Sequence, residues 1–149
     1  HCADFHISIY ENLKKDFIDR GLVKFEHHAF PLDLAALNAE IIVRCHVNND
    51  EKFKLLKKIY EKQKDWASGN RDDIIKGLLS IGRQSGLTDK KSRDCMENGK
   101  LAENLIEIFK KNATKDSISS TPSFVINGQL VQNMSYEELK NIIDDNLEK

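Results

Sequence analysis

Two short stretches, far apart in the chain, contain residue types that could support chemistry. The sequence opens "HCADFH", which places Cys2 beside His1. A cysteine thiolate is the nucleophile of thiol–disulfide exchange, and a nearby helix N-terminus or cationic side chain favours that ionised form. The second stretch, "TPSFVINGQLV", puts Pro122 at the mouth of an apolar strand, although proline cannot donate a ladder hydrogen bond. These two features need a common explanation.

The residues after Cys2 predict an amphipathic helix over residues 3–20. Its apolar residues recur at every fourth position: Phe5, Ile9, Leu13 and Phe17. Gly21 then provides a stop signal. Cys2 is expected at or just before the first turn, where unpaired N–H groups favour its thiolate. Many cysteines at helix starts are only small, half-buried residues, and position alone leaves that interpretation open.

The next segments predict a strand and then a helical block. Residues 22–30, "LVKFEHHAF", are rich in β-branched and aromatic residues and end at Pro31, which is typical of a strand. From residue 33 to about residue 114 the apolar spacing is helical throughout, and the helices are separated by glycines: Gly69, Gly86 and Gly99. Because this block shows no strand pattern, we interpret it as a helical insertion with a small core of its own.

The last part of the chain predicts a hairpin and a helix. The segments "SFVIN" and "QLVQ" are joined by Asn127-Gly128, a strong signal for a two-residue hairpin turn. Ser135 and Glu138 have the spacing of a capping box, which predicts the start of a final helix. The expected order is therefore helix, strand, helical block, strand, strand, helix.

Composition excludes several classes of function. The chain has 149 residues, which is enough for one domain or one domain with an insertion. Its 23 basic and 24 acidic residues give a net charge of −1, so no general attraction to nucleic acid is expected. No apolar run is long enough to cross a bilayer, so we do not expect a membrane protein. No signal peptide is recognisable, although the chain begins as though an upstream segment had been removed.

This order of features resembles the DsbA family of secreted thiol–disulfide oxidoreductases in the thioredoxin superfamily. The letters "HC" at residues 1 and 2 match the second half of its Cys-x-His-Cys motif. The stretch "TPSFVINGQLV" is similar to its Thr-Pro loop and hairpin, and "FPLDLAALNAEIIVRC" and "QKDW" resemble the entry to its helical insertion. The resemblance implies an α/β, thioredoxin-like fold with an inserted all-helical domain. Residues 1–32 and 115–149 would form the thioredoxin-like part, and residues 33–114 the insertion.

The resemblance also implies a site. Thr121 and cis Pro122 would bind an extended substrate peptide and face the active-site cysteines; a trans proline at an edge strand is the alternative. Cys2 and His1 would both be catalytic: Cys2 as the more buried cysteine that resolves mixed disulfides, and His1 as the residue between the cysteines that stabilises the ionised thiol. The nucleophilic cysteine would lie three positions before Cys2, upstream of the chain, and so would the strand that feeds the first helix. We therefore expect the fold to lack its N-terminal strand or strands.

The implied function is that of a protein disulfide oxidoreductase of the exported-protein folding pathway. It would donate disulfides to unfolded or reduced exported proteins in a bacterial periplasm, or as a secreted protein, and a membrane redox partner would reoxidise it. No cofactor is implied. One alternative is an isomerase or glutathione transferase of a related branch. Another is a non-catalytic, chaperone-like module that binds peptides through the apolar surface around Pro122.

The remaining cysteines and the histidines suggest structural roles. Cys45 and Cys95 lie on predicted core faces of the helical block, and in an oxidising compartment a structural disulfide between them is favoured over two buried free thiols. The spacings of the five histidines fit no recognised zinc pattern, so no metal site is expected. We expect His27 and His28 on opposite faces of a strand and His6 at the surface.

Overall fold

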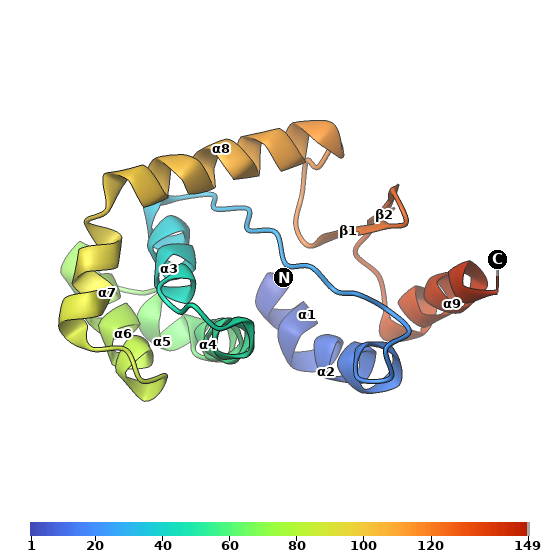
Figure 1. Ribbon diagram of the computed structural model, residues 1–149, viewed down its shortest axis with the longest axis horizontal. Coiled ribbons are helices and arrows are strands. Elements are labelled where there is room, and N and C mark those ends of the chain that lie inside the picture. The colour runs from blue at the N-terminus through green and yellow to red at the C-terminus, as the bar shows by residue number, and fades with distance from the viewer. Residues whose placement is uncertain (149) are drawn as a thin grey trace. The chain divides into compact units, whose positions relative to one another are not determined.

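The computed structural model describes residues 1–148 and divides the chain into two compact units (Figure 1). Unit 1 contains residues 1–28 and the chain from residue 111 onward, and unit 2 contains residues 29–110. Both divisions fall a few residues before the boundaries expected from the sequence. Residues in each unit pack against other residues of the same unit.

Unit 2 is helical. It contains α3 (Leu34–Arg44), α4 (Asn49–Glu61), α5 (Gln63–Trp66), α6 (Arg71–Gln84), α7 (Asp89–Met96) and most of α8 (Gly99–Lys115). Side chains fix the starts of these helices: Asp33 accepts a hydrogen bond from the Ala36 amide, and Asn70 and Asp73 form a capping box at α6.

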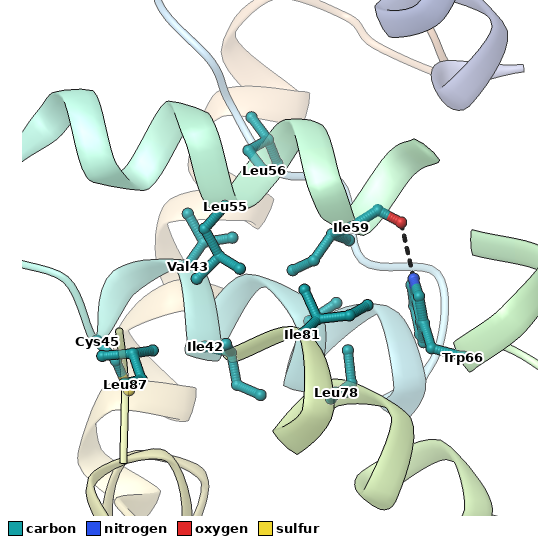
Figure 2. Packing of buried hydrophobic residues seen from close by; sticks show 11 residues of the cluster. Ile42, Val43, Cys45, Leu55, Leu56, Ile59, Trp66, Leu78, Ile81 and Leu87 are labelled. Carbon is teal, nitrogen blue, oxygen red and sulfur yellow. Dashed lines mark hydrogen bonds between the residues drawn. The ribbon is translucent and has the colours of Figure 1, made fainter. Parts of the chain in front are cut away.

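The core of unit 2 is built from residues of that unit alone (Figure 2). Ile42, Leu55 and Leu78 have no exposed surface, and each such side chain contributes roughly 1.5–3 kcal/mol through burial. The Trp66 indole donates a 2.7 Å hydrogen bond to the Ile59 carbonyl, which satisfies the one polar atom of a buried ring. Unit 2 therefore has a hydrophobic core of its own.

Gly77 provides a test of this packing. A Cβ atom at that position would lie 2.8 Å from the Trp66 Cβ and 2.9 Å from its Cα, too close for either backbone to remain in place. Alanine normally stabilises a helix interior by about 1 kcal/mol relative to glycine. We expect Gly77→Ala to do the opposite and lower the free energy of unfolding by about 2 kcal/mol, measured by urea denaturation.

Gly99→Ala is the matched control, because nothing lies within 4 Å of the Cβ it would add. That variant should be at least as stable as the parent chain. A Gly77→Ala variant that gains stability like the control would contradict the close approach of α5 to α6.

Unit 1 begins with a helix that is interrupted. In place of one helix over residues 3–20, the chain forms α1 (Cys2–Ser8), α2 (Tyr10–Leu13) and a π-helical segment, η1 (Lys14–Ile18). The interruption lies at Ile9, whose φ of −112° departs from helical geometry. The predicted apolar face survives, since Phe5, Leu13 and Phe17 are all buried.

The hairpin formed by β1 (Ser123–Ile126) and β2 (Gln129–Gln132) is confirmed, and it is the one sheet among residues 1–148. The strands are antiparallel, with Val125 opposite Leu130. Asn127 and Gly128 both have positive φ angles, 49° and 84°, as a type I′ turn requires. The final helix, α9 (Tyr136–Leu147), starts at the predicted capping box of Ser135 and Glu138.

The strand predicted over residues 22–30 is wrong. The segment does show β-like alternation, because Phe25 and His27 are half-buried whereas Lys24, Glu26 and His28 are exposed. A strand also needs a neighbour to complete its ladder of hydrogen bonds, and no described segment pairs with this one. The local sequence favours an extended segment, but it does not contain the partner strand.

Tyr136 holds α9 to the helices at the start of the chain. Its hydroxyl donates a hydrogen bond to the Asp16 carboxylate and lies 3.5 Å from the Asn12 carbonyl. Burial, together with the Asp16 hydrogen bond, raises the pKa of Tyr136 to about 12. The phenol therefore remains a donor at neutral pH.

None of the described helices combines the length and apolar character needed to cross a membrane.

Candidate functional site

An aromatic contact brings the helix that carries Cys2 to the hairpin that follows Pro122. Phe5 lies one turn after Cys2 in α1, and Phe124 lies two residues after Pro122. Their ring centroids are 4.9 Å apart, and Phe5 is buried. The start of α1 and the Thr-Pro loop are thus held on the same side of unit 1.

Cys2 is half-buried, and it is the one free cysteine that the structure describes. It is the first residue of α1, and its neighbour His1 occupies the N-cap position without a side-chain capping bond. The His1 carbonyl accepts a 3.1 Å hydrogen bond from the Phe5 amide, so the backbone around Cys2 is ordered by the helix. A half-buried sulfur in such a position can exchange with a disulfide held beside it.

The Thr-Pro loop has a defined backbone. The Thr121–Pro122 peptide bond is cis, and both residues are half-buried. The Ser123 hydroxyl donates a 2.6 Å hydrogen bond to the Ser120 carbonyl and closes the loop across the proline. Thr121 and Pro122 are therefore fixed next to the hairpin that carries the Phe124 ring.

The exposed face of the hairpin carries one apolar pair. Val125 and Leu130 lie opposite each other, and 42% and 40% of their respective surfaces are exposed. Apolar side chains that are paired across two strands and exposed to solvent are suited to contact with another chain.

His6 is buried, so the expectation of a surface residue is wrong. Only 6% of its surface is exposed, and its ring centroid lies 5.4 Å from that of Phe5, 5.2 Å from Tyr10 and 6.1 Å from His27. Burial lowers the pKa of His6 to about 4, with a smaller contribution from His27. The imidazole is neutral at pH 7. Two features of the sequence indicate that His6 is buried. It follows Phe5, a residue of the apolar face, and it lies four residues after Cys2.

The low pKa of His6 makes the stability of the protein depend on pH. In the unfolded chain a histidine titrates near pH 6.5, whereas in the folded protein His6 does so near pH 4. Between these values only the unfolded state binds the proton, so stability is fully present above pH 6.5 and falls as the pH drops toward 4. The expected loss from His6 is about 3 kcal/mol, measured by urea denaturation at several pH values.

His6→Gln should remove this part of the pH dependence, because glutamine does not titrate. His28→Gln is the matched control, since His28 is exposed and lies beside Glu26. An unaltered pH dependence in His6→Gln would show that His6 is not held neutral by the fold.

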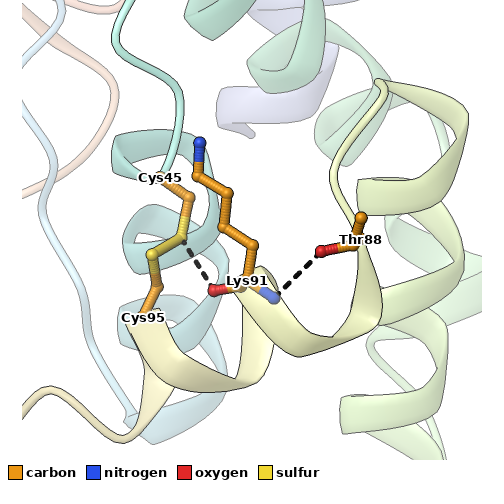
Figure 3. Close-up of a disulfide and its surroundings, with 4 residues drawn as sticks. All are labelled: Cys45, Thr88, Lys91 and Cys95. Atoms are coloured by element: carbon orange, nitrogen blue, oxygen red, sulfur yellow. Dashed lines mark hydrogen bonds between the residues drawn. A yellow bond between two sulfur atoms is a disulfide. The ribbon is translucent and has the colours of Figure 1, made fainter.

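Cys45 and Cys95 form a disulfide within unit 2 (Figure 3). Cys45 caps the end of α3, Cys95 belongs to α7, and their Cα atoms are 6.2 Å apart. Cys45 is 6% exposed, so this sulfur is held in the core rather than presented at the surface. A structural role for the disulfide remains a prediction.

The histidines do not gather into a metal site. Among residues 1–148 there is no group of three or more histidine, cysteine or acidic side chains arranged to hold a metal ion. His27 packs against His6, whereas the His28 Nδ1 lies 2.9 Å from the Asn112 amide nitrogen.

Comparisons with known sequences identify related proteins. A model of a thioredoxin family matches residues 1–145. A protein of Rickettsia typhi named "putative protein-disulfide oxidoreductase" is 28% identical over 148 residues, which are 99% of this chain and 54% of that protein. Disulfide bond formation protein D of Bacillus subtilis is 30% identical over 160 residues, covering 98% of this chain and 67% of that protein. The chain thus spans about half the length of the Rickettsia relatives it matches.

Comparison with solved structures establishes the fold. The crystal structure of Wolbachia pipientis α-DsbA1 matches with a TM-score of 0.87 at 20% identity, covering 99% of this chain and 79% of that one. A protein-disulfide isomerase from Novosphingobium aromaticivorans matches with a TM-score of 0.77 at 21% identity, covering 100% of this chain and 87% of that one. The DsbA-like, thioredoxin-like fold is therefore shared with these proteins.

Proposed function

Because the chain belongs to the thioredoxin family, in its DsbA-like branch, we propose that the complete protein is a thiol–disulfide oxidoreductase that donates disulfides to other proteins. The observation that supports this most directly is the contact between Phe5 and Phe124, which joins the helix of Cys2 to the loop of cis Pro122. A free thiol and a loop able to hold an extended peptide are thereby combined in one unit.

The reaction requires a second cysteine, three positions before Cys2, bonded to the Cys2 sulfur in the oxidised protein. A substrate thiolate attacks the sulfur of that upstream cysteine, the bond to Cys2 breaks, and Cys2 leaves as a thiolate. A second substrate thiolate then attacks the substrate sulfur of the mixed disulfide and releases the upstream cysteine as its thiolate. Two electrons pass from the substrate to the enzyme, and its two thiolates take up the protons that the substrate thiols lost. Cys2 also attacks mixed disulfides that fail to proceed and frees the enzyme from them.

Thr121 and Pro122 have the positioning role in this proposal. Proline has no backbone N–H and donates no backbone hydrogen bond. A carbonyl acceptor at the edge of the hairpin can therefore stay available. An extended substrate segment can then pair with the backbone beside Thr121 while its cysteine reaches the active-site sulfur. The substrates are reduced or unfolded exported proteins of a bacterium, in the periplasm or outside the cell, and a membrane redox partner restores the disulfide.

The proposed activity is tested with the complete protein and a reduced peptide that contains two cysteines. Oxidised protein should convert the peptide to its disulfide in a one-to-one ratio and become reduced itself, as followed by mass spectrometry after acid quenching. A peptide that stays reduced at the rate of the uncatalysed control would reject the proposal.

A peptide-binding function without catalysis is the second candidate, and the exposed pair of Val125 and Leu130 favours it. The two functions separate in the Cys2→Ala variant. Peptide binding, measured by fluorescence anisotropy, should survive that substitution if binding is the function, and it should be lost on Leu130→Glu. Disulfide donation requires the Cys2 sulfur itself.

A further inference from the structure

A side-chain hydrogen bond, rather than a backbone ladder, holds the loop that contains Thr121 and Pro122. Within residues 1–148, the backbone groups of residues 119–122 form no hydrogen bond with another backbone group. The Ser120 carbonyl instead accepts a 2.6 Å hydrogen bond from the Ser123 hydroxyl. Thr121 and Pro122 therefore lie between the acceptor and the donor of this bond, and their position depends on it.

The hairpin fixes Ser123 itself. Ser123 is the first residue of β1 and lies opposite Gln132 of β2. Gln132 also reaches the loop, because its side-chain oxygen lies 3.5 Å from the Ser120 hydroxyl. Ser120 is thus connected to both strands of the hairpin. The order of the hairpin is passed in this way to the two residues that follow Ser120.

Ser123 lies on the opposite face of the hairpin from the aromatic contact. Side chains alternate between the two faces of a strand, so Ser123 shares a face with Val125, whereas Phe124 contacts the Phe5 ring. The Ser123 hydroxyl therefore acts on the loop and takes no part in the ring contact that joins the hairpin to α1.

We propose that the Ser123 hydroxyl positions the Thr-Pro loop for binding an extended substrate peptide. This inference deepens the proposed function and rests on it. A peptide that binds a loop of fixed shape does not have to order that loop, so less conformational freedom is lost on binding. Because an extended peptide gains affinity through backbone hydrogen bonds, its binding is sensitive to where the backbone of Thr121 lies.

Two substitutions at this position separate the hydroxyl from the shape of the side chain. Ser123→Val and Ser123→Thr both introduce a β-branched side chain that suits a strand, but the threonine keeps a hydroxyl able to donate to the Ser120 carbonyl. The matched control is Ser119→Val, because Ser119 is exposed and forms no hydrogen bond in the described part of the chain. All variants are made in the complete protein.

The first measurement is the binding of a short fluorescein-labelled peptide of alternating valine and serine, without cysteine, followed by fluorescence anisotropy. We expect Ser123→Val to raise the Kd about three- to tenfold, which is the effect of one lost hydrogen bond. Ser123→Thr and Ser119→Val should bind the peptide as the parent does. In the oxidation of a reduced peptide, Ser123→Val should raise KM by the same factor and leave kcat unchanged, because the hydroxyl acts on binding.

Equal Kd values for Ser123→Val and Ser123→Thr would overturn the inference, since these variants differ in the hydroxyl. A parent protein that does not bind the labelled peptide would overturn it as well. A fall in the kcat of Ser123→Val as large as the rise in its KM would show a general structural effect and would also reject the positioning role.

The fate of the proposed function can be distinguished from this result, because the labelled peptide contains no cysteine. Binding that depends on the Ser123 hydroxyl, in a protein that fails to oxidise peptides, rejects disulfide donation and keeps the positioning role. Peptide oxidation with the same KM in Ser123→Val and Ser123→Thr rejects the positioning role alone.

Discussion

Replacing Cys2 by alanine in the complete protein is expected to lower the rate of disulfide donation to a reduced peptide by at least about a hundredfold, which corresponds to roughly 2.7 kcal/mol in the barrier. Without the Cys2 sulfur the protein has no active-site disulfide to donate and no thiol to resolve a mixed disulfide. The loss should appear in the rate of peptide oxidation under single-turnover conditions, with equal amounts of folded protein.

Ser8→Ala is the matched control for this substitution, because Ser8 is exposed and belongs to the same helix. Its rate should equal that of the parent. The Cys2→Ala protein should also accumulate mixed disulfides with the peptide when the peptide is supplied as an activated disulfide. Undiminished donation by Cys2→Ala would reject the role assigned to this cysteine.

Reduction of the Cys45–Cys95 disulfide is expected to destabilise unit 2 by about 4 kcal/mol. The two cysteines are separated by 50 positions, and closing a loop of that length removes much of the conformational freedom of the unfolded chain. The bond joins α3 to α7, whose side chains contribute to the core around Ile42 and Leu78. The measurement is the urea midpoint of the chain before and after mild reduction.

The double variant Cys45→Ala, Cys95→Ala separates the bond from other effects of the reductant. It should be less stable than the oxidised parent, and reductant should not change its midpoint. An unchanged midpoint of the parent after reduction, with both thiols shown to be free by alkylation, would contradict a stabilising role.

The local elements of the fold could be predicted because their signals lie in a few adjacent residues. Asn127-Gly128 dictates the turn since both positions need positive φ, and Ser135 with Glu138 fixes the start of α9. The bounds of α6 follow from Asn70 as its N-cap and from the glycine after its end, Gly86. The order of such elements is what the chain shares with the DsbA family.

The features that depend on distant contacts could not be predicted from the same signals. The segment of residues 22–30 has the alternation of a strand, but a ladder requires a partner that the local sequence does not contain. His6 follows Phe5 at the apolar side of the first helix, but its burial also depends on contact with His27, which lies about twenty residues further along the chain. The contact of Phe5 with Phe124 joins residues from the two ends of the chain, which no local pattern specifies.

The central claim is that Cys2 and Pro122 are neighbours in the folded protein, and a spin label on Cys2 tests it most directly. Cys2 is the free thiol of the structure, so a nitroxide reagent attaches there, and it broadens the amide signals of residues close to it. Strong broadening is expected at Thr121 and Ser123, on either side of the proline, and weaker broadening at Gly128 in the hairpin turn. Sharp signals at Thr121 and Ser123 in the labelled, folded protein would contradict it.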